Sequence, residues 1–254
     1  MLYGNESIST YTPSNVCIWM ALAFQGGLLN MGGFLACGRF VSHVTGFATF
    51  FGVEVTKHDY SSALGMLLVP LFFLLGAVLS GLLVDIRLKL HKRPKYYIIF
   101  GVLFLLLLFI VVTGFNGAFG EFGGPLALSD YGLLALLCLI CGMQNGMITT
   151  VSRAVVRTTH LTGITTDLGI GIVRVLHRKK LDYSIEDEVR ANLVRVGLII
   201  FFGLGSLIGG FAFTRMGYKG FLLPLFITGV LFGSTLYFDR FRGVRPKLDF
   251  HLKS

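Results

Sequence analysis

Long apolar runs, separated by short polar segments, dominate the chain and predict helices that cross a membrane. A helix needs about 20 predominantly apolar residues to cross about 30 Å of hydrocarbon. Six runs reach this length, and the segments between them carry most of the charged residues. The runs cover residues 16–38, 62–86, 96–115, 131–150, 193–213 and 220–238.

Two further apolar stretches, residues 40–55 and 154–175, are shorter or interrupted by polar groups. A helix of about 16 residues reaches roughly 24 Å, which is less than the hydrocarbon thickness. These stretches therefore predict short re-entrant or broken helices that enter the membrane without crossing it, and the length argument alone leaves a tilted crossing open.

The two short stretches repeat one pattern, which indicates that the chain consists of two related halves. A second set of matched glycines follows at a distance of 129 positions, Gly76 and Gly81 with Gly205 and Gly210, and predicts close helix crossings. The first pattern consists of His43, Thr45, Gly46, Thr49 and Gly52, matched 117 positions later by His160, Thr162, Gly163, Thr166 and Gly169.

The repeat divides a single membrane domain, residues 1–254, into two halves. Membrane carriers commonly place their sites where two such repeats meet. The first half covers residues 16–115 and the second 130–238, with a Gly-rich linker at 116–129 and a basic tail at 239–254.

Composition also places the chain among membrane proteins. Of its 254 residues, 54% are hydrophobic and only 14% are charged, whereas an ordinary soluble domain has about 25% charged residues. The net charge of +9 does not indicate nucleic-acid binding, because the cations lie in short loops beside apolar runs, where they orient the protein and contact anionic lipid headgroups. We therefore expect the lipid bilayer as a partner and no nucleic acid.

The Lys and Arg clusters predict the orientation of the chain. They lie at residues 87–95, 174–190 and 240–253, whereas residues 116–129 contain neither Lys nor Arg. If neither short stretch crosses, all three clusters fall on one side, which is cytoplasmic by the positive-inside tendency. Each half then has three spans, so the second half is inverted relative to the first and both termini are cytoplasmic.

The step from Thr to Gly in each repeated stretch is typical of a helix start. The Thr hydroxyl can accept a hydrogen bond from a first-turn amide, and Gly leaves the neighbouring amides approachable. A helix that begins inside the membrane directs free amides and a partial positive charge at that point, where an anion or polar group can bind. We expect solute contacts at His43, Thr45, Gly46 and Thr49 and at His160, Thr162, Gly163 and Thr166.

These residues also fit structural roles, which the sequence leaves open. Small residues and Thr favour close packing of membrane helices, and His43 and His160 can hold a loop as readily as they contact a ligand or titrate. Gln144 and Asn145, also candidate solute contacts, can line a path or bond to neighbouring helices. The duplication of the pattern is what favours a transport site.

Asp167 is an ionisable group that the first copy lacks, because a Phe occupies the matching position. Charged groups inside membrane segments are costly and mark functional sites by default, so Asp167 is a candidate carrier of a proton or cation. Arg153 or Arg157 can instead pair with it in a purely structural arrangement. Arg39 is a third candidate charge partner, and Glu54 is expected to reach the membrane surface.

Catalytic and metal-binding motifs are absent from the sequence. It contains no phosphate loop, HExxH or GxSxG motif, and Cys138 and Cys141 lie in an apolar run, where thiols pack as small hydrophobes. His43, His160 and Asp167 can serve acid–base chemistry, but nothing identifies a substrate. We expect no enzyme, no cofactor and no metal.

Several of these segments resemble the YoaK-like family of bacterial multi-pass inner-membrane proteins. The resemblance rests on residues 39–52, 142–145, 155–163 and 166–169, and it spans about residues 16–238. It implies a bacterial multi-pass protein of the inner membrane, in a family with no established biochemical role.

We therefore expect an all-α integral membrane protein with six transmembrane helices, two short re-entrant or broken helices and an inverted two-fold repeat. The expected function is a small-solute transporter or channel, anion-selective or proton-coupled, with its site between the two His-x-Thr-Gly helix starts. The alternative is a non-transporting sensor, a scaffold, or a protein that binds lipid or a partner. The sequence does not identify the solute and leaves the oligomeric state open, a homo-oligomer included.

Overall fold

The computed structural model describes residues 12–125, 127–151, 160–177 and 186–241, and within these ranges every regular element is a helix. In chain order the elements are α1 (Pro13–Cys37), α2 (Val44–Thr56), α3 (Tyr60–Ser80), the π-helical segment η1 (Gly81–Asp85), α4 (Ile86–Lys89), α5 (Tyr96–Phe115), α6 (Leu128–Val151), α7 (Leu161–Leu176), α8 (Glu186–Met216), the 3-10 helix η3 (Gly217–Phe221) and α9 (Leu222–Phe241).

The long helices have the length and the exposed surface of membrane helices. Five helical stretches of the described chain are long and apolar enough to cross a membrane, and η3 divides the last of them, residues 186–239, into α8 and α9. Large apolar side chains such as Leu71, Leu105 and Phe226 are 54%, 62% and 72% exposed. Soluble proteins rarely expose apolar surface on this scale, so the fold is that of a multi-helix membrane protein.

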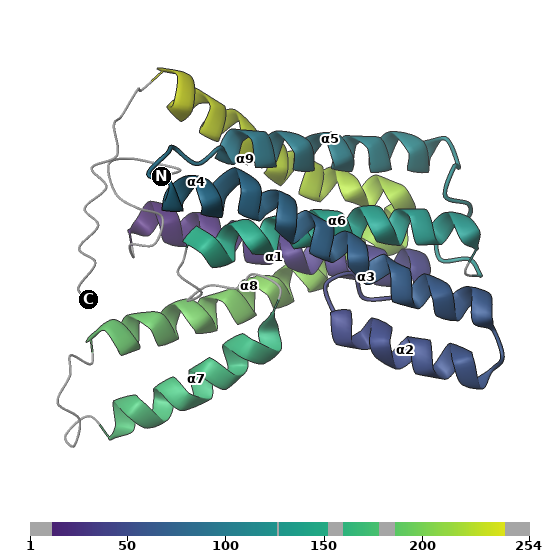
Figure 1. Ribbon diagram of the computed structural model, residues 1–254, viewed down its shortest axis with the longest axis horizontal. Helices are drawn as coiled ribbons and strands as arrows, with labels where there is room; N and C mark the ends of the chain where they lie inside the picture. Colours follow the sequence, from purple (N-terminus) through teal and green to yellow (C-terminus); the bar gives the residue numbers. More distant parts are fainter. Residues whose placement is uncertain (1–11, 126, 152–159, 178–185, 242–254) are drawn as a thin grey trace.

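α1 and α6 form the centre of the bundle and run antiparallel to each other (Figure 1). In their apolar stretches, 67% and 72% of the residues are buried, against 22% in the stretch that contains α3. α3 packs along α6, and α8 packs along α1. α5 and α9 pack together on one side of this central pair, and α2 and α7 lie on the other side (Figure 1). The short helices therefore lie at the edge of the bundle.

Glycines set the two closest helix crossings. A Cβ added at Gly76 or Gly142 would overlap the backbone of the facing helix, α6 or α3, and one added at Gly27 or Gly205 would overlap α8 or α1 in the same way. The contacts at Gly76 and Gly205 confirm the predicted crossing points, whereas a Cβ at Gly81 meets open space. Because the same pair of crossings occurs twice, the α3–α6 and α1–α8 contacts are built alike.

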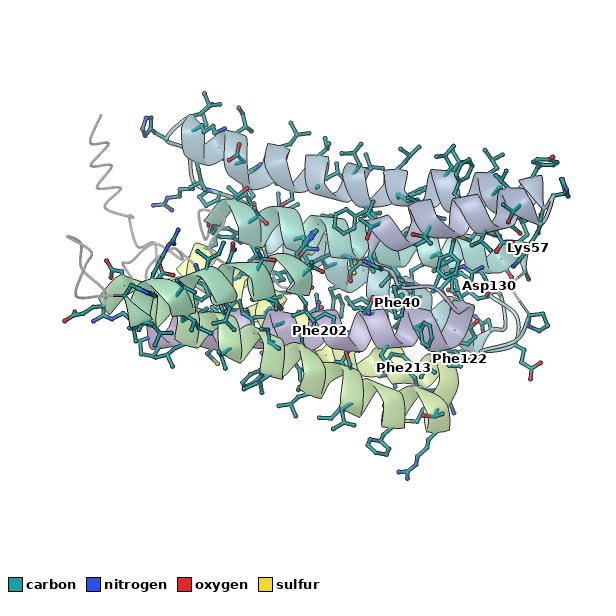
Figure 2. The ribbon with its side chains drawn as sticks, turned by 90° about the horizontal axis from the view of Figure 1, so that it is seen from below. Phe40, Lys57, Phe122, Asp130, Phe202 and Phe213 are labelled. Atoms are coloured by element: carbon teal, nitrogen blue, oxygen red, sulfur yellow. The ribbon has the colours of Figure 1, made fainter. Side chains whose placement is uncertain are left out.

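The loop between α5 and α6 is folded onto the ends of the helices. Phe122 stacks on Phe213 of α8 at a centroid distance of 6.2 Å, and the ring of Tyr218 meets Phe122 edge-on at 5.0 Å. This aromatic cluster lies toward the end of the bundle that carries Lys57 and Asp130 (Figure 2). The connection between α4 and α5, with its cluster of cations, lies at the opposite end (Figure 1).

Most helix boundaries agree with the apolar pattern, and the differences have local causes. α5 covers the predicted residues 96–115. α8 starts at Glu186 because its acidic first turn continues directly into the apolar part of the helix. α2 and α7 start at Val44 and Leu161, so each is shorter than the stretch that predicted it.

Candidate functional site

α2 and α7 both begin near the middle of the bundle and run toward its opposite ends (Figure 1). α2 packs on α3, and α7 packs on α8. Their N-cap residues are His43 and His160, and neither side chain forms a capping hydrogen bond. No N-cap side chain therefore bonds a first-turn amide in either short helix, although in α2 the Gly46 amide donates to the carbonyl of His43 at 2.9 Å.

The ring of His43 lies over the first turn of α2. Its Nε2 is 2.8 Å from Oγ1 of Thr45, and a Cβ added at Gly46 would come 2.8 Å from its Nδ1. Gly46 therefore leaves the space that the ring fills. The expectation that a Thr hydroxyl caps this helix is wrong, because the N-cap residue is His43 and Thr45 contacts its ring.

The threonines of both copies lie on exposed helix faces. In each copy the second Thr donates its hydroxyl to the carbonyl oxygen of the first, at 3.2 Å in α2 and 3.0 Å in α7. Gly52 and Gly169 complete a stripe with the two threonines of their helix, and a Cβ added at either glycine would meet nothing within 4 Å. Among the described residues the stripes therefore do not form close helix packing. The four exposed threonines are Thr45, Thr49, Thr162 and Thr166.

Both histidines are exposed and touch aromatic rings. His43 meets Phe40 edge-on at a centroid distance of 6.1 Å, and His160 meets Phe73 of α3 at 6.3 Å. The contact with Phe73 joins the start of α7 to the helix on which α2 packs. The two helix starts therefore lie along one shared helix, with Gly163 in the first turn of α7.

Asp167 is half-buried on α7, nearly two turns beyond the start of the helix. It forms no ion pair with any of the described residues. Its predicted partners, Arg153 and Arg157, lie outside the described residues, so that pairing stays a prediction. The matching position in α2 is Phe50, which serves a different role beside Arg39.

Gln144 belongs to a buried hydrogen-bond chain at the centre of the fold. Thr228 of α9 donates to Oε1 of Gln25 at 3.1 Å, Gln25 donates to Oε1 of Gln144 at 3.1 Å, and Gln144 donates to the carbonyl of Leu22 at 2.8 Å. Thr228 and both glutamines are 0% exposed, and Asn145 is 4% exposed. Gln144 and Asn145 therefore lie inside the protein and not on the exposed face of the helix starts.

Arg39 pairs with Glu54 across the loop that leads into α2. Its Nη2 is 3.2 Å from Oε1 of Glu54, and Lys57 lies 3.5 Å from Oε2 of the same carboxylate. The guanidinium also lies 4.0 Å from the ring centroid of Phe50. The expectation that Glu54 reaches the membrane surface is wrong, because its side chain is 8% exposed and held between two cations.

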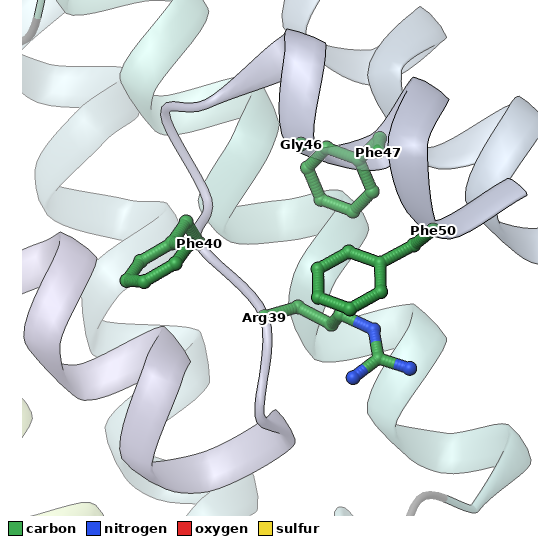
Figure 3. Close-up of a pocket in the computed structure, with 5 residues that line it drawn as sticks. All are labelled: Arg39, Phe40, Gly46, Phe47 and Phe50. Carbon is green, nitrogen blue, oxygen red and sulfur yellow. The ribbon is translucent and has the colours of Figure 1, made fainter. Parts of the chain in front are cut away.

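A narrow hollow separates this loop from α2. Its volume is about 140 Å³, counting the space that opens to the outside. At the edge of the hollow, the guanidinium of Arg39 lies over the ring of Phe50 (Figure 3). The other lining residues are Phe40, Gly46 and Phe47 (Figure 3).

A second carboxylate between two cations lies at the outer end of α7. Glu188, in the first turn of α8, accepts hydrogen bonds from Arg195 at 2.8 Å and from Arg174 of α7 at 3.1 Å. The pKa of Glu188 is held below its usual range by these two bonds, and the bond from Arg195 has the larger effect. No motif in the sequence points to Glu188, and the available signal was the acidic first turn of α8 beside a cationic end of α7.

One family model matches most of the chain. It is described as "Protein of unknown function (DUF1275)" and matches residues 18–234. Neither the curated proteins nor the solved structures give a match. The matched region contains both helix starts, and it is consistent with the YoaK-like resemblance of the sequence.

Proposed function

The chain belongs to the DUF1275 family, and we propose that it moves a small solute or ion across the membrane through a site between the N-termini of α2 and α7. The proposal covers a channel or a carrier, without catalysis. The proposed contacts with the solute are Thr45, Gly46 and Thr49 of α2, Thr162, Gly163 and Thr166 of α7, and the two preceding histidines, His43 and His160.

One observation carries this proposal. Both short helices start near the middle of the bundle (Figure 1), with exposed threonines and without a capping bond from their N-cap side chains. Lipid cannot solvate such amides, so backbone of this kind is tolerated at membrane depth only when it is covered by protein or lines a water-filled cavity. A wet cavity at this depth is what a transport site requires.

The architecture supports an inverted repeat of three spans and one re-entrant helix in each half. The spans of the first half are α1, α3 and α5, and those of the second are α6, α8 and α9. The crossing of α3 with α6 matches that of α8 with α1 in its glycine contacts. In known carriers, rocking of such paired halves gives alternating access to a site at their interface.

The helix N-termini favour an anionic or carboxylate-bearing solute, because their amides and partial positive charge stabilise negative groups. Asp167, half-buried on α7, or the two histidines would couple transport to protons. The cation-rich connection between α4 and α5 would face the cytoplasm of a bacterial cell, together with both termini, and the α5–α6 loop would face outward.

The exposure of the threonine stripes favours a second candidate function. An exposed face of small and polar residues on a short helix also suits a lipid or a partner helix. The protein would then be a sensor or a scaffold that moves nothing. Under this candidate Thr45→Val and Thr162→Val lower binding of the partner and abundance together, whereas under transport they spare abundance.

The experiment is a flux measurement with purified protein in liposomes. Uptake of a panel of small carboxylates, inorganic anions and monovalent cations is compared with that of protein-free liposomes, with and without an imposed pH gradient. The proposal predicts flux of at least one anion above the control. Absence of flux across the whole panel, for protein that is folded and inserted, would overturn it.

A further inference from the structure

The carboxylates of Glu54 and Glu188 lie at matching places in the two halves, although they come from different helices. Glu54 is on α2, and the residue 117 positions later is Gly171 of α7, which has no side chain. A Cβ added at Gly171 would overlap Oδ1 of Asn192 and come 2.6 Å from Oε1 of Glu188 and 2.8 Å from Nη1 of Arg195. The place that Glu54 fills from α2 is thus filled at α7 by Glu188 and Asn192 of α8.

Each carboxylate also has the same kind of surroundings, one shielded arginine and one exposed cation. The shielded arginines are Arg39 and Arg195, whose side chains are 17% and 13% exposed. The exposed cations are Lys57 and Arg174, at 62% and 50%. Two different sets of residues therefore place a carboxylate between one shielded arginine and one exposed cation at the outer end of each short helix.

We propose that Glu54 and Glu188 are matched latches, one toward each face of the membrane, and that release of a latch lets its short helix move away from the bundle and opens the path to the helix starts from that face. The inference rests on the proposed function for its purpose, because a carrier must open to one face at a time. The latches themselves are a property of the fold and can be tested without a known solute.

The geometry fits a contact that must break and re-form. The bond from Arg174 to Glu188 joins α7 directly to α8, and the bond from Arg39 to Glu54 joins the loop after α1 to α2. The pair of Lys57 with Glu54 lies at the end of α2 itself. The arginine side chain of the Arg174–Glu188 pair is 50% exposed, and an ion pair with an exposed partner contributes little stability. Arg195 stays beside Glu188 when α7 moves, and Lys57 stays beside Glu54 when α2 moves, so opening leaves neither carboxylate without a cation.

Phe47 and Ile164 provide matched probes of the movement. They are 117 positions apart, lie on the inner faces of α2 and α7, and are each 2% exposed. The variants Phe47→Cys and Ile164→Cys are each made in a Cys17→Ser background. Cys17 is exposed and is therefore removed, whereas the other three cysteines are buried and stay in place. A membrane-impermeant maleimide is then added from each face in turn, and the labelling rate is measured.

Arg174→Ala removes the exposed cation of the α7 latch, and we expect it to raise labelling at position 164 about two- to fivefold from the face on which α7 ends. Glu188→Gln leaves two arginines without their acid and raises the rate about tenfold or more. Arg39→Ala and Glu54→Gln act in the same way on position 47, from the opposite face. Glu186→Gln and Glu121→Gln remove exposed acids outside the latches and leave both rates unchanged.

Labelling that rises at one probe and from one face supports the latch. Unchanged rates in all four latch variants overturn it, and so does an equal rise at both probes, which indicates general loosening. If the carboxylate variants fail to fold, Arg174→Ala and Arg39→Ala alone test the proposal. Absence of solute flux with face-specific labelling would remove the transport proposal and keep the latches, whereas flux with unchanged labelling would do the reverse.

Discussion

Gln25 donates its side-chain amide to Oε1 of Gln144 at 3.1 Å and thereby joins the two central helices, α1 and α6. Both side chains are fully buried, in a part of the fold that is otherwise packed with apolar groups. A buried amide is stable there only when its donors and acceptors have partners. The bond therefore fixes how α1 and α6 meet, at the level of single residues.

Replacement of Gln25 by Leu should destabilise the fold. Oε1 of Gln144 and the hydroxyl of Thr228 would each lose a buried partner, which costs about 1–3 kcal/mol. Thr228→Val removes only the outermost donor and should cost about 0.5–1.5 kcal/mol. Unfolding by SDS in mixed micelles measures both. A Gln25→Leu protein as stable as wild type would show that the bond does not hold α1 and α6 together.

Gly142→Ala should loosen the crossing of α3 and α6. The added methyl group would overlap the backbone at Phe73, and overpacking of this kind costs about 1–3 kcal/mol. Gly132 lies on the same helix with open space around it, so Gly132→Ala is the matched control and should be neutral or slightly stabilising. Equal stability of the two variants, measured by thermal unfolding in detergent, would contradict the crossing.

Acidification should weaken the contact between α7 and α8. The pKa of Glu188 is lowered by its bonds to Arg195 and Arg174, so its contribution to stability is present above the ordinary Glu value of about 4.3 and is lost as the pH falls through the lower folded value. The stability advantage of wild type over Glu188→Gln is therefore greatest at neutral pH and shrinks below about pH 4. A difference that does not change with pH would contradict the ion pair.

Reporter fusions should place the two ends of the bundle on opposite sides of the membrane. A fusion after Ser254 should report the cytoplasm, and one within residues 117–125 should report the opposite side, because cations gather at the end with the α4–α5 connection. Finding both reporters in the cytoplasm would rule out an inverted repeat of three spans per half.

The positions of the long helices could be predicted from the sequence, because lipid demands about 20 apolar residues per span regardless of packing. Which helices lie at the centre was harder to foresee. α1 and α6 carry Gln25 and Gln144 and are less apolar than α3 or α5. Polar groups inside the membrane need protein partners, so these two glutamines were the available signal for the central pair.

The candidate site could be predicted in part. The repeated His, Thr and Gly residues located the two helix starts, because the same pattern recurs 117 positions later. The pattern predicted Thr45 as the cap of α2, whereas the N-cap residue is His43 and the hydroxyl of Thr45 lies 2.8 Å from Nε2 of its ring. The pairing of Arg39 with Glu54 depends on how the intervening loop folds back, and no local pattern encodes that path.

The central claim is that solute passes between the starts of α2 and α7, and the most direct test is flux through the double variant Thr45→Val, Thr162→Val in liposomes. Thr56 is an exposed threonine at the outer end of α2, about three turns from Thr45 and so away from the helix start, and Thr56→Val is therefore the matched control. We predict that the double variant is as abundant and stable as wild type but loses most of its flux, while Thr56→Val keeps it. Full flux through the double variant, or an equal loss in the control, would contradict the claim.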